Sequence, residues 1–547
     1  MKASDLFVKC LEQEGVQYVF GLPGEETEDL LFSLDASPIT FVPTRHEQGA
    51  AFMADVWGRL TGKAGVCLST LGPGATNLIT GVADANLDKS PVVAITGQAN
   101  LTRVHKESHQ YLDIIGLFRP ITKWSASITH PNVVPEVVRK AFKIAESEKP
   151  GATHIELPED VAGLETDRQP LKPYHVRRPD PDQQALREAV ALLTRATKPL
   201  VIAGNGAVRK DASQQLRTFV SRCHTPIAHT FMGQGAVSDD SPYSLHTIGL
   251  GFRDFVMEAV DAADLIVTIG YDAAEYAPEV WNPRRDKTII HIDFIPAEVD
   301  AHYQPAVELV ADIGATLREL NELLASASCT IDPTWYVPIR DRIRADIAGY
   351  DLVDGRAFTV PGVLNLLRRL MDDDDLLISD VGSHKMWIAR NFPTRCPNGC
   401  LISNGLASMG FALPGAIGAA LANPSRRIVA AMGDGGFLMN SQELETAKRL
   451  GVAFVVLVFN DNDYGLISWK QQMSHGRSTG TRLTNPDFKA YAESFGIVGY
   501  HPTSLTQLTL QLREALASRK LCVMEIPIDQ SVNVELIQKL NWYFKSR

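Results

Sequence analysis

The chain has 547 residues, of which 45% are hydrophobic and 21% are charged, a composition typical of globular proteins. This length exceeds what one hydrophobic core supports and predicts about three domains of roughly 100–200 residues each. The net charge of -11 provides no general basic surface, so we expect neither nucleic acid nor a membrane as a partner. Seven scattered cysteines and the lack of a signal-peptide pattern predict reduced thiols in the cytoplasm.

The first part of the chain, residues 1–166, alternates short apolar runs with helix-like segments. The runs that we predict to be strands are residues 17–20, 39–43, 65–69 and 92–96. The glycine turns and helical patterns between these runs are typical of a parallel, doubly wound sheet. A polar stretch with several prolines follows at residues 166–184 and is predicted to be a linker.

The rest of the chain repeats this alternation in two further parts. Strands are predicted at residues 200–203, 265–269 and 288–292, and then at 376–378, 428–432, 454–459 and 522–526. We therefore predict the α/β class, with three doubly wound parallel-sheet domains at residues 1–166, 185–330 and 361–547. The first and third parts share a strand, a glycine-rich turn, a helix and a second apolar strand, which suggests duplicated halves.

A glycine turn in the third part is the most informative motif. Gly433-Asp434-Gly435-Gly436 follows an apolar strand, and such glycines let the backbone approach an anion at the next helix N-terminus. The next predicted strand brings Asn460-Asp461-Asn462-Asp463 to the same sheet edge, with oxygens suited to Mg²⁺ or Ca²⁺. The turn has neither P-loop nor GxGxxG spacing, which argues against ATP and NAD. Alone, it also fits an ordinary βαβ connection.

Glu47 is the candidate acid in the first part of the chain. It lies between a predicted strand and an apolar helix, where a carboxyl group can be partly buried. A helix dipole also favours an acid in the first turn, so Glu47 alone fits a structural role. Together with the anion and metal motif, Glu47 instead predicts an acid that activates the ring of an organic cofactor.

Several motifs resemble those of one enzyme family. They are FGLPGEE, TRHEQGAAFMADVWGRLTGKAGV, TLGPGATN, SHQYLDIIGLFRPITKW, VTIGYDAAEYAPEVW, DVGSHKMW, ISNGLASMGFALPGAIGAAL and the Gly-Asp-Gly turn with its Asn-Asp pair. Together they cover nearly the whole chain and resemble the catalytic subunits of acetolactate synthases, in the thiamin diphosphate-dependent decarboxylase superfamily. The resemblance implies that the first domain binds the cofactor's pyrimidine and that the third binds its diphosphate.

The resemblance also implies catalytic roles for individual residues. Glu47 would hydrogen-bond the aminopyrimidine N1′ and promote the imino tautomer that deprotonates thiazolium C2. Met409 would hold the cofactor in its bent form, and the carbonyl near Ala407 would accept from the 4′-amino group. Gln110 and Lys470 are candidates for contact with the substrate.

The implied metal ligands are Asp434 and Asp461, through their side chains, and Asp463, through its backbone oxygen. The metal would be Mg²⁺ or another divalent ion. The remaining residues expected to bind the cofactor are Pro23, Gly24, Asn77, Gly382, Ser383, His384, Gly433, Gly435, Gly436, Tyr464 and Gly465.

Departures from the family pattern indicate a subclass. Asp461 replaces the second asparagine of the usual pair and keeps an oxygen ligand. FAD-containing biosynthetic synthases carry a tryptophan where this chain has Lys470. The Gly270-Tyr271-Asp272 run and the His109-Gln110 pair also resemble the FAD-independent catabolic type, so bound FAD is not expected. Glu25 stands where many members have a small residue, and a helix-entry acid is the other interpretation.

The implied reaction decarboxylates pyruvate and adds the two-carbon carbanion to a second pyruvate, giving 2-acetolactate and CO2. A simple 2-oxo acid decarboxylase is the nearest alternative because it shares the cofactor residues, and another thiamin-dependent carboligase is a related alternative. Pyruvate decarboxylases protonate the carbanion with a His-His pair, whereas this chain has His109-Gln110, which favours carboligation. A non-catalytic anion-binding regulatory subunit is a third alternative, which the retained Glu47 argues against. A fermentative and a biosynthetic role both remain open.

The resemblance further implies an assembly. In the family the cofactor lies between the first domain of one chain and the third domain of another, so we expect a homodimer or homotetramer. Glu47 and Asp434 would then serve one site from different subunits. Residues 530–547 are expected to form either a lid over that site or an exposed terminal helix.

Overall fold

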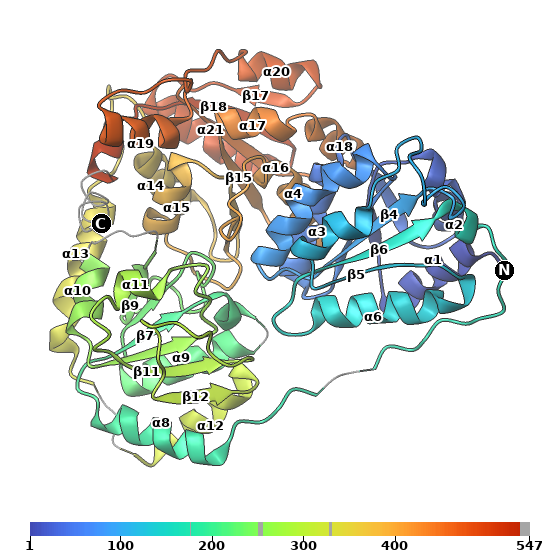
Figure 1. Cartoon of the computed structure of the whole chain (residues 1–547). Coiled ribbons are helices and arrows are strands. Elements are labelled where there is room, and N and C mark those ends of the chain that lie inside the picture. Colours follow the sequence, from blue (N-terminus) through green and yellow to red (C-terminus); the bar gives the residue numbers. More distant parts are fainter. Residues whose placement is uncertain (175–176, 210, 250–254, 328–330, 537–547) are drawn as a thin grey trace.

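The computed structural model describes residues 1–174, 177–209, 211–249, 255–327 and 331–536. It contains three six-stranded sheets, and every pairing between their strands is parallel (Figure 1). The predicted α/β class with three doubly wound parallel sheets is confirmed. Each sheet lies within one of the three predicted domains. The exact domain boundaries remain a prediction. Two of these boundaries, at residues 330 and 547, lie outside the described residues.

The first sheet has the order β2-β1-β3-β4-β6-β5. Its strands are β1 Tyr18–Gly21, β2 Thr40–Pro43, β3 Gly65–Ser69, β4 Val92–Gln98, β5 Trp124–Ser127 and β6 Ala152–Pro158. Its helices are α1 Ala3–Glu14, η1 Glu25–Thr27, α2 Glu28–Asp35, α3 Glu47–Thr61, α4 Pro73–Leu87, α5 Ile114–Phe118, η2 Arg119–Ile121, η3 Pro131–Val133, α6 Val134–Glu146 and α7 Glu159–Ala162. The four predicted strands are confirmed, and the pattern missed β5 and β6.

The third sheet has the order β14-β13-β15-β16-β18-β17, which is the order of the first sheet when strands are counted within each domain. Its strands are β13 Leu376–Ser379, β14 Cys400–Ile402, β15 Ile428–Gly433, β16 Val455–Asn460, β17 Val498–Tyr500 and β18 Cys522–Pro527. Its helices are α14 Val360–Leu370, α15 Ser383–Asn391, α16 Ala412–Ala422, α17 Asp434–Asn440, α18 Glu443–Leu450, α19 Gly465–His475, α20 Phe488–Ser494 and α21 Leu505–Ser518. The shared order supports the predicted likeness of the two parts.

The central sheet has a different order, β12-β11-β10-β7-β8-β9, which read from its other end is the 3-2-1-4-5-6 order of dinucleotide-binding folds. Its strands are β7 Pro199–Ala203, β8 Ile227–His229, β9 Ser244–Thr247, β10 Leu265–Ile269, β11 Thr288–Asp293 and β12 Val307–Val310. Its helices are α8 Gln183–Arg195, η4 Asn205–Val208, α9 Ala212–Cys223, α10 Phe255–Ala262, α11 Pro278–Trp281 and α12 Ile313–Ala325.

The connection between the second and third sheets contains η5 Pro333–Trp335 and α13 Val337–Ala348. Ile339 and Ile343 of α13 are buried in the core of the central domain, which explains why this short segment is helical. Among the helices of the described ranges, none is both long and apolar enough to cross a lipid bilayer.

The first and third domains share one hydrophobic core along helices α3 and α16 (Figure 1). Helix α16 is rich in glycine and alanine, so its backbone lies close to α3. A Cβ at Gly418 would lie only 2.3 Å from the Met53 carbonyl oxygen. Phe52 of α3 also packs edge-on against Phe411, at 5.5 Å between ring centroids. The two domains that carry the predicted site residues are therefore rigidly joined within one chain.

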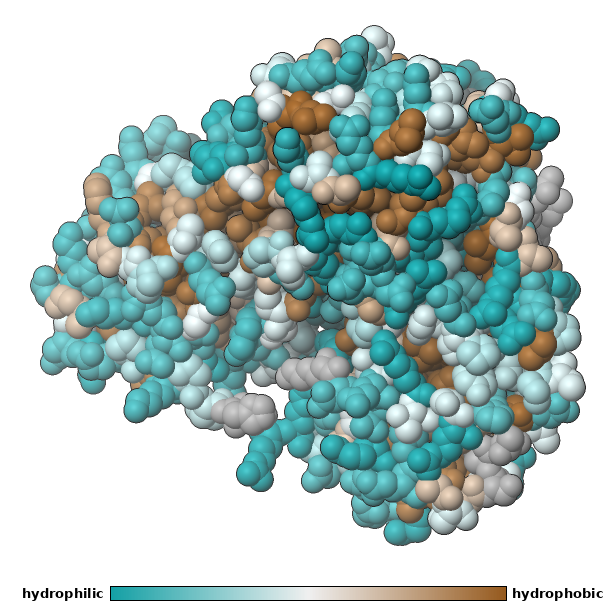
Figure 2. All heavy atoms as spheres, turned by 180° about the vertical axis from the view of Figure 1, so that it is seen from behind, coloured by the Kyte–Doolittle hydropathy of each residue, from teal (hydrophilic) through white to brown (hydrophobic). Residues whose placement is uncertain are grey.

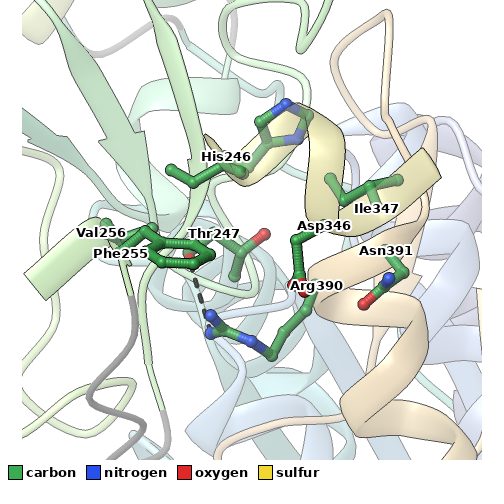
Figure 3. Close-up of a pocket in the computed structure, with 9 residues that line it drawn as sticks. His246, Thr247, Phe255, Val256, Asp346, Ile347, Arg390 and Asn391 are labelled. Atoms are coloured by element: carbon green, nitrogen blue, oxygen red, sulfur yellow. Dashed lines mark hydrogen bonds between the residues drawn. The ribbon is translucent and has the colours of Figure 1, made fainter. Parts of the chain in front are cut away.

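The central domain holds the C-terminal end of helix α15. The Gln234 side chain donates to the Ala389 carbonyl oxygen at 3.1 Å, and Arg390 approaches the Thr247 carbonyl oxygen at 3.5 Å. Figure 3 shows Arg390 beside Thr247 and Phe255, at a cavity of about 20 Å³, which has room for about one water molecule. Because the N-terminus of the same helix carries Ser383 and His384, the central domain helps to fix the predicted diphosphate residues.

Candidate active site

The predicted acid Glu47 is the first residue of helix α3. His46 caps this helix, since its side chain accepts a hydrogen bond from the Gln48 backbone N–H. Glu47 is only 7% exposed, and the Asn77 amide donates to its Oε2 at 3.0 Å. Among the described residues, Asn77 is the one hydrogen-bond partner of the Glu47 carboxylate. The structure therefore brings together two of the predicted residues, from α3 and α4.

The turn between β3 and α4 gathers further predicted residues. Gly72 has φ +51°, and a Cβ there would lie 2.6 Å from the Gln110 carbonyl oxygen, so only glycine fits. A Cβ at Gly74 would lie 3.2 Å from Glu47 Oε1. The backbone of Gln110 therefore borders the corner that holds Glu47, while its side chain is exposed.

The chain that follows β1 borders the same turn. A Cβ at Gly24 would lie 2.3 Å from the Thr70 side chain, and Thr70 donates to Glu26 at 2.6 Å. Pro23 is exposed next to Gly24. Glu25, whose role the sequence left open, is exposed and begins η1, as the helix-entry interpretation expects.

In the third domain, His384 lies at the start of α15 and faces the glycine turn. Its ring would lie 2.8 Å from a Cβ at Gly382 and 3.2 Å from one at Gly433. Burial lowers the pKa of His384 to about 4, so the ring is neutral at pH 7. Its Nε2 is buried and has no hydrogen-bond partner within the described ranges. An unpartnered ring nitrogen fits a site for a polar ligand, and the helix N-terminus beside it favours an anionic group such as a diphosphate.

The predicted metal ligands lie at the carboxyl ends of β15 and β16, which are adjacent strands. Asp434 Oδ1 accepts from the Gly435 N–H at 2.9 Å, and its Oδ2 accepts from the Asn462 N–H at 2.8 Å. Burial and the charge of Asp434 raise the pKa of Asp461 to about 7. The Asp463 N–H donates to Asp461 Oδ1 at 3.1 Å. Two close carboxylates of this kind fit a divalent cation between them.

No group of three or more His, Cys, Asp and Glu side chains within the described ranges is arranged to hold a metal ion. The predicted metal site differs from such a group, because its ligands are two carboxylates and one backbone oxygen. Hard oxygen ligands of this kind suit Mg²⁺, which usually binds a few protein oxygens together with phosphate and water. The donor chemistry therefore fits the predicted metal, and the ligand assignment remains a prediction.

Other predicted residues surround these groups. Tyr464 packs against the glycine turn, since a Cβ at Gly435 would lie 2.6 Å from its ring, and Gly465 begins α19. Lys470 is exposed on the same helix. Ala407 and Met409 are half-buried in the loop between β14 and α16.

Sequence reasoning missed three residues that shape this site. Asn485 Nδ2 lies 2.6 Å from Asp434 Oδ2 and 3.1 Å from the side-chain oxygens of both Asn460 and Asn462. Asp380 accepts from backbone N–H groups in the loop that holds Met409, and Glu443 contacts the turn before Glu47. Asp380 lies two residues after the predicted strand 376–378, and this position next to a strand end could have indicated it. Nothing local to Asn485 or Glu443 indicates their long-range contacts.

Comparisons with known proteins agree with this geometry. Family models match the N-terminal TPP binding domain of thiamine pyrophosphate enzymes at residues 1–117, their central domain at 186–320 and their C-terminal TPP binding domain at 380–526. The fold and the site thus define a thiamine pyrophosphate (thiamin diphosphate) enzyme.

Similar proteins show to which family of thiamine pyrophosphate enzymes the chain belongs. The chain is 36% identical to an acetolactate synthase of Bacillus subtilis (strain 168), over 98% of this chain and 94% of that protein. It is 35% identical to a catabolic acetolactate synthase of Raoultella terrigena, over 98% and 97%. It is 33% identical to the acetolactate synthase isozyme 2 large subunit of Escherichia coli (strain K12), again over 98% and 97%. The chain belongs to the acetolactate synthase family.

Proposed function

We propose that this enzyme decarboxylates pyruvate and joins the resulting two-carbon unit to a second pyruvate, giving 2-acetolactate and CO2. The observation that carries this proposal is full-length similarity to acetolactate synthases in a chain that keeps Glu47, paired with Asn77, and the Asp434–Asp461 pair. A catalytically silent relative has no need of a buried acid at the first site and of paired carboxylates at the second.

We propose thiamine pyrophosphate and Mg²⁺ as the cofactors. When bound, thiamine pyrophosphate supplies the nucleophile and the electron sink that decarboxylation needs. Glu47 would exchange a proton with the pyrimidine at its Oε atoms, and Asn77 keeps that carboxylate oriented. Gly382, Ser383 and His384 would contact the diphosphate at the N-terminus of α15, and Asp434 and Asp461 would hold the metal.

We also propose that pyruvate lies near Gln110 and Lys470. Both side chains are exposed in this chain, so they are free to face a substrate or a second subunit. Lys470 would offer a positive charge to the carboxylate of pyruvate. We propose that FAD is not required, on the basis of Lys470, the Gly270-Tyr271-Asp272 run and similarity to a catabolic synthase.

We propose a homodimer or homotetramer whose active sites lie between subunits. Large apolar side chains are exposed beside the predicted cofactor residues, at Leu406, Leu438, Met439 and Ile467. Figure 2 shows an apolar band on the face opposite to that of Figure 1. Exposed apolar surface of this kind is typical of a protein interface. Several relatives are named large subunits, so a small regulatory subunit is a further candidate partner.

We propose the cytoplasm as the location of the enzyme. Six cysteines in the described ranges are free thiols, as a reducing compartment favours.

The experiment that tests the activity is incubation of the purified protein with pyruvate, thiamine pyrophosphate and Mg²⁺, followed by separate assays of acetolactate and acetaldehyde. We expect acetolactate to dominate. Dominant acetaldehyde would show a simple decarboxylase instead. Mass and absorbance spectra of cofactors released from the purified protein test the flavin proposal, because retained FAD would absorb in the visible range.

A further inference from the structure

A cluster of buried charges lies where the first domain meets the third. Arg59 of α3 is surrounded by Asp55, Asp84 and Asp88, whose side chains are fully buried, while Arg59 itself is 7% exposed. Its guanidinium binds Asp55 at 2.7 and 2.9 Å and Asp88 Oδ2 at 2.6 Å. Charges this deeply buried are costly unless each one is paired, so their placement requires a structural or functional reason.

The cluster binds the backbone of one loop of the third domain, residues 402–411. Arg59 Nη1 donates to the Ile402 carbonyl oxygen at 2.9 Å. The Asp88 carboxylate accepts from the Asn404 N–H at 3.1 Å and from the Gly405 N–H at 2.5 Å. The Arg59 guanidinium also lies 5.1 Å from the centre of the Phe411 ring. One arginine therefore contacts both ends of the loop, and Asp88 holds the backbone between them.

The loop has a conformation that needs such support. Ala407 has φ +59°, a left-handed conformation that is unfavourable for a residue with a Cβ. Strained residues of this kind persist only where their surroundings fix them. The far end of the loop is fixed by Asp380, which accepts from the Gly410 N–H at 3.1 Å and from the Phe411 N–H at 3.0 Å.

We propose that Asp88 and Arg59 are positioning residues for the cofactor, acting through the loop that carries Ala407 and Met409. The inference rests on the proposed function, because it assumes that this loop contacts thiamine pyrophosphate. Both residues belong to the first domain, whereas the loop belongs to the third. The contact between domains thus sets the loop geometry before the cofactor binds, which lowers the entropy lost on binding.

Asp84 provides a matched control within the cluster. Its Oδ1 accepts from the Ser403 hydroxyl at 2.7 Å, and its Oδ2 has no hydrogen-bond partner within the described ranges. Burial and the charges of Asp88 and Asp55 raise the pKa of Asp84 well above its ordinary value. Asparagine keeps the size of Asp84 and an oxygen that can accept from the Ser403 hydroxyl, so Asp84→Asn should change little.

Asp88→Asn also preserves the size of the side chain, but we expect it to weaken the contacts with the loop. Asp88 receives N–H donors on both of its oxygens, so an asparagine must direct its NH2 group at one of them. We expect faster hydrogen exchange of the Asn404 and Gly405 amides in the cofactor-free protein, by at least about tenfold, and about tenfold weaker binding of thiamine pyrophosphate by fluorescence titration. The KM for pyruvate, measured at saturating cofactor, should change less than twofold. Asp84→Asn should match the unmodified protein in every measurement.

Unchanged exchange and cofactor affinity in Asp88→Asn would overturn the proposal. If Asp88→Asn does not fold, Arg59→Lys carries the test, because lysine keeps the charge and loses the fork that reaches Ile402. Failure of both variants to fold, with Asp84→Asn folded, would assign the cluster to stability alone and also overturn the proposal. The proposed function fails separately, if the unmodified protein makes no acetolactate.

Discussion

The carboxylate of Glu443 accepts a hydrogen bond of 3.0 Å from the backbone N–H of His46, the residue that caps helix α3 directly before Glu47. The same carboxylate accepts from the Arg45 N–H at 3.1 Å and from the Thr446 hydroxyl at 2.7 Å. Glu443 belongs to α18 of the third domain and is fully buried. The third domain therefore fixes the turn from which the proposed catalytic acid projects.

Removal of this acceptor should weaken both the fold and the reaction. Glu443→Ala leaves two partly buried N–H groups without a partner, which costs up to about 1–3 kcal/mol each. We expect a lower free energy of unfolding in urea and a lower rate of acetolactate formation. Glu443→Gln keeps one acceptor oxygen for these N–H groups and can donate to Thr446, so it should be more stable than Glu443→Ala. Equal stability of the Ala and Gln variants would contradict this assignment.

The same residue should make stability depend on pH. Burial raises the pKa of Glu443 from 4.5 to about 7 in the folded protein. Between these values the unfolded chain releases a proton that the folded chain retains, so the free energy of unfolding falls as pH rises from about 4.5 to 7. The loss from Glu443 is on the order of 3 kcal/mol, and it is complete above pH 7. The difference between Glu443→Gln and the unmodified protein, followed by urea unfolding across this range, isolates the contribution. A difference that does not vary with pH would refute it.

Glu47→Gln tests the catalytic acid. Glutamine fills the same space and can still contact Asn77, so thiamine pyrophosphate should bind nearly as before. Turnover should fall by at least about 10²-fold, the usual cost of losing a general acid or base. Steady-state kinetics with pyruvate measures the fall, and fluorescence titration measures cofactor binding. Near-normal turnover in this variant would remove Glu47 from the reaction.

Metal removal tests the paired carboxylates. A ligand that binds the folded state raises the melting temperature, so thiamine pyrophosphate with Mg²⁺ should stabilise the protein. EDTA should abolish this shift, and added Mg²⁺ should restore it. Asp434→Ala should show no shift at any Mg²⁺ concentration, whereas Asp461→Asn keeps an oxygen ligand and should retain it. A full shift in the presence of EDTA would show that cofactor binding needs no metal.

Sequence patterns predicted most of the longer apolar strands, whereas the short strands β8, β9, β12, β14 and β17 were missed. Strand β3 is buried along its whole length, and its predicted bounds are those observed. Strand β6 was missed because it contains His154 and Glu156. Their polar groups are satisfied by the distant residues Thr96, at 2.9 Å, and Gln98, at 2.9 Å. A period-based prediction does not register such partners.

The residues of the site also divide into those that local sequence patterns predicted and those that they missed. Glu47 and the Gly433–Gly436 turn were predicted because each lies in a distinctive local motif. Glu443 was missed because its contact with His46 spans 397 residues of sequence, and Asn485 reaches Asp434 across 51 residues. Contacts of this range depend on how the domains pack, which no local pattern describes.

The shared strand order of the first and third sheets has a chemical consequence. Strand β3 and strand β15 occupy the same place in their sheets, so the turn before α4 and the turn before α17 are equivalent positions. One turn borders an acid and an amide suited to proton exchange, and the other bears an aspartate and glycines suited to a cation and an anion. The shared fold therefore does not determine the chemistry. A few side chains at one repeated position decide which half of the reaction each domain serves.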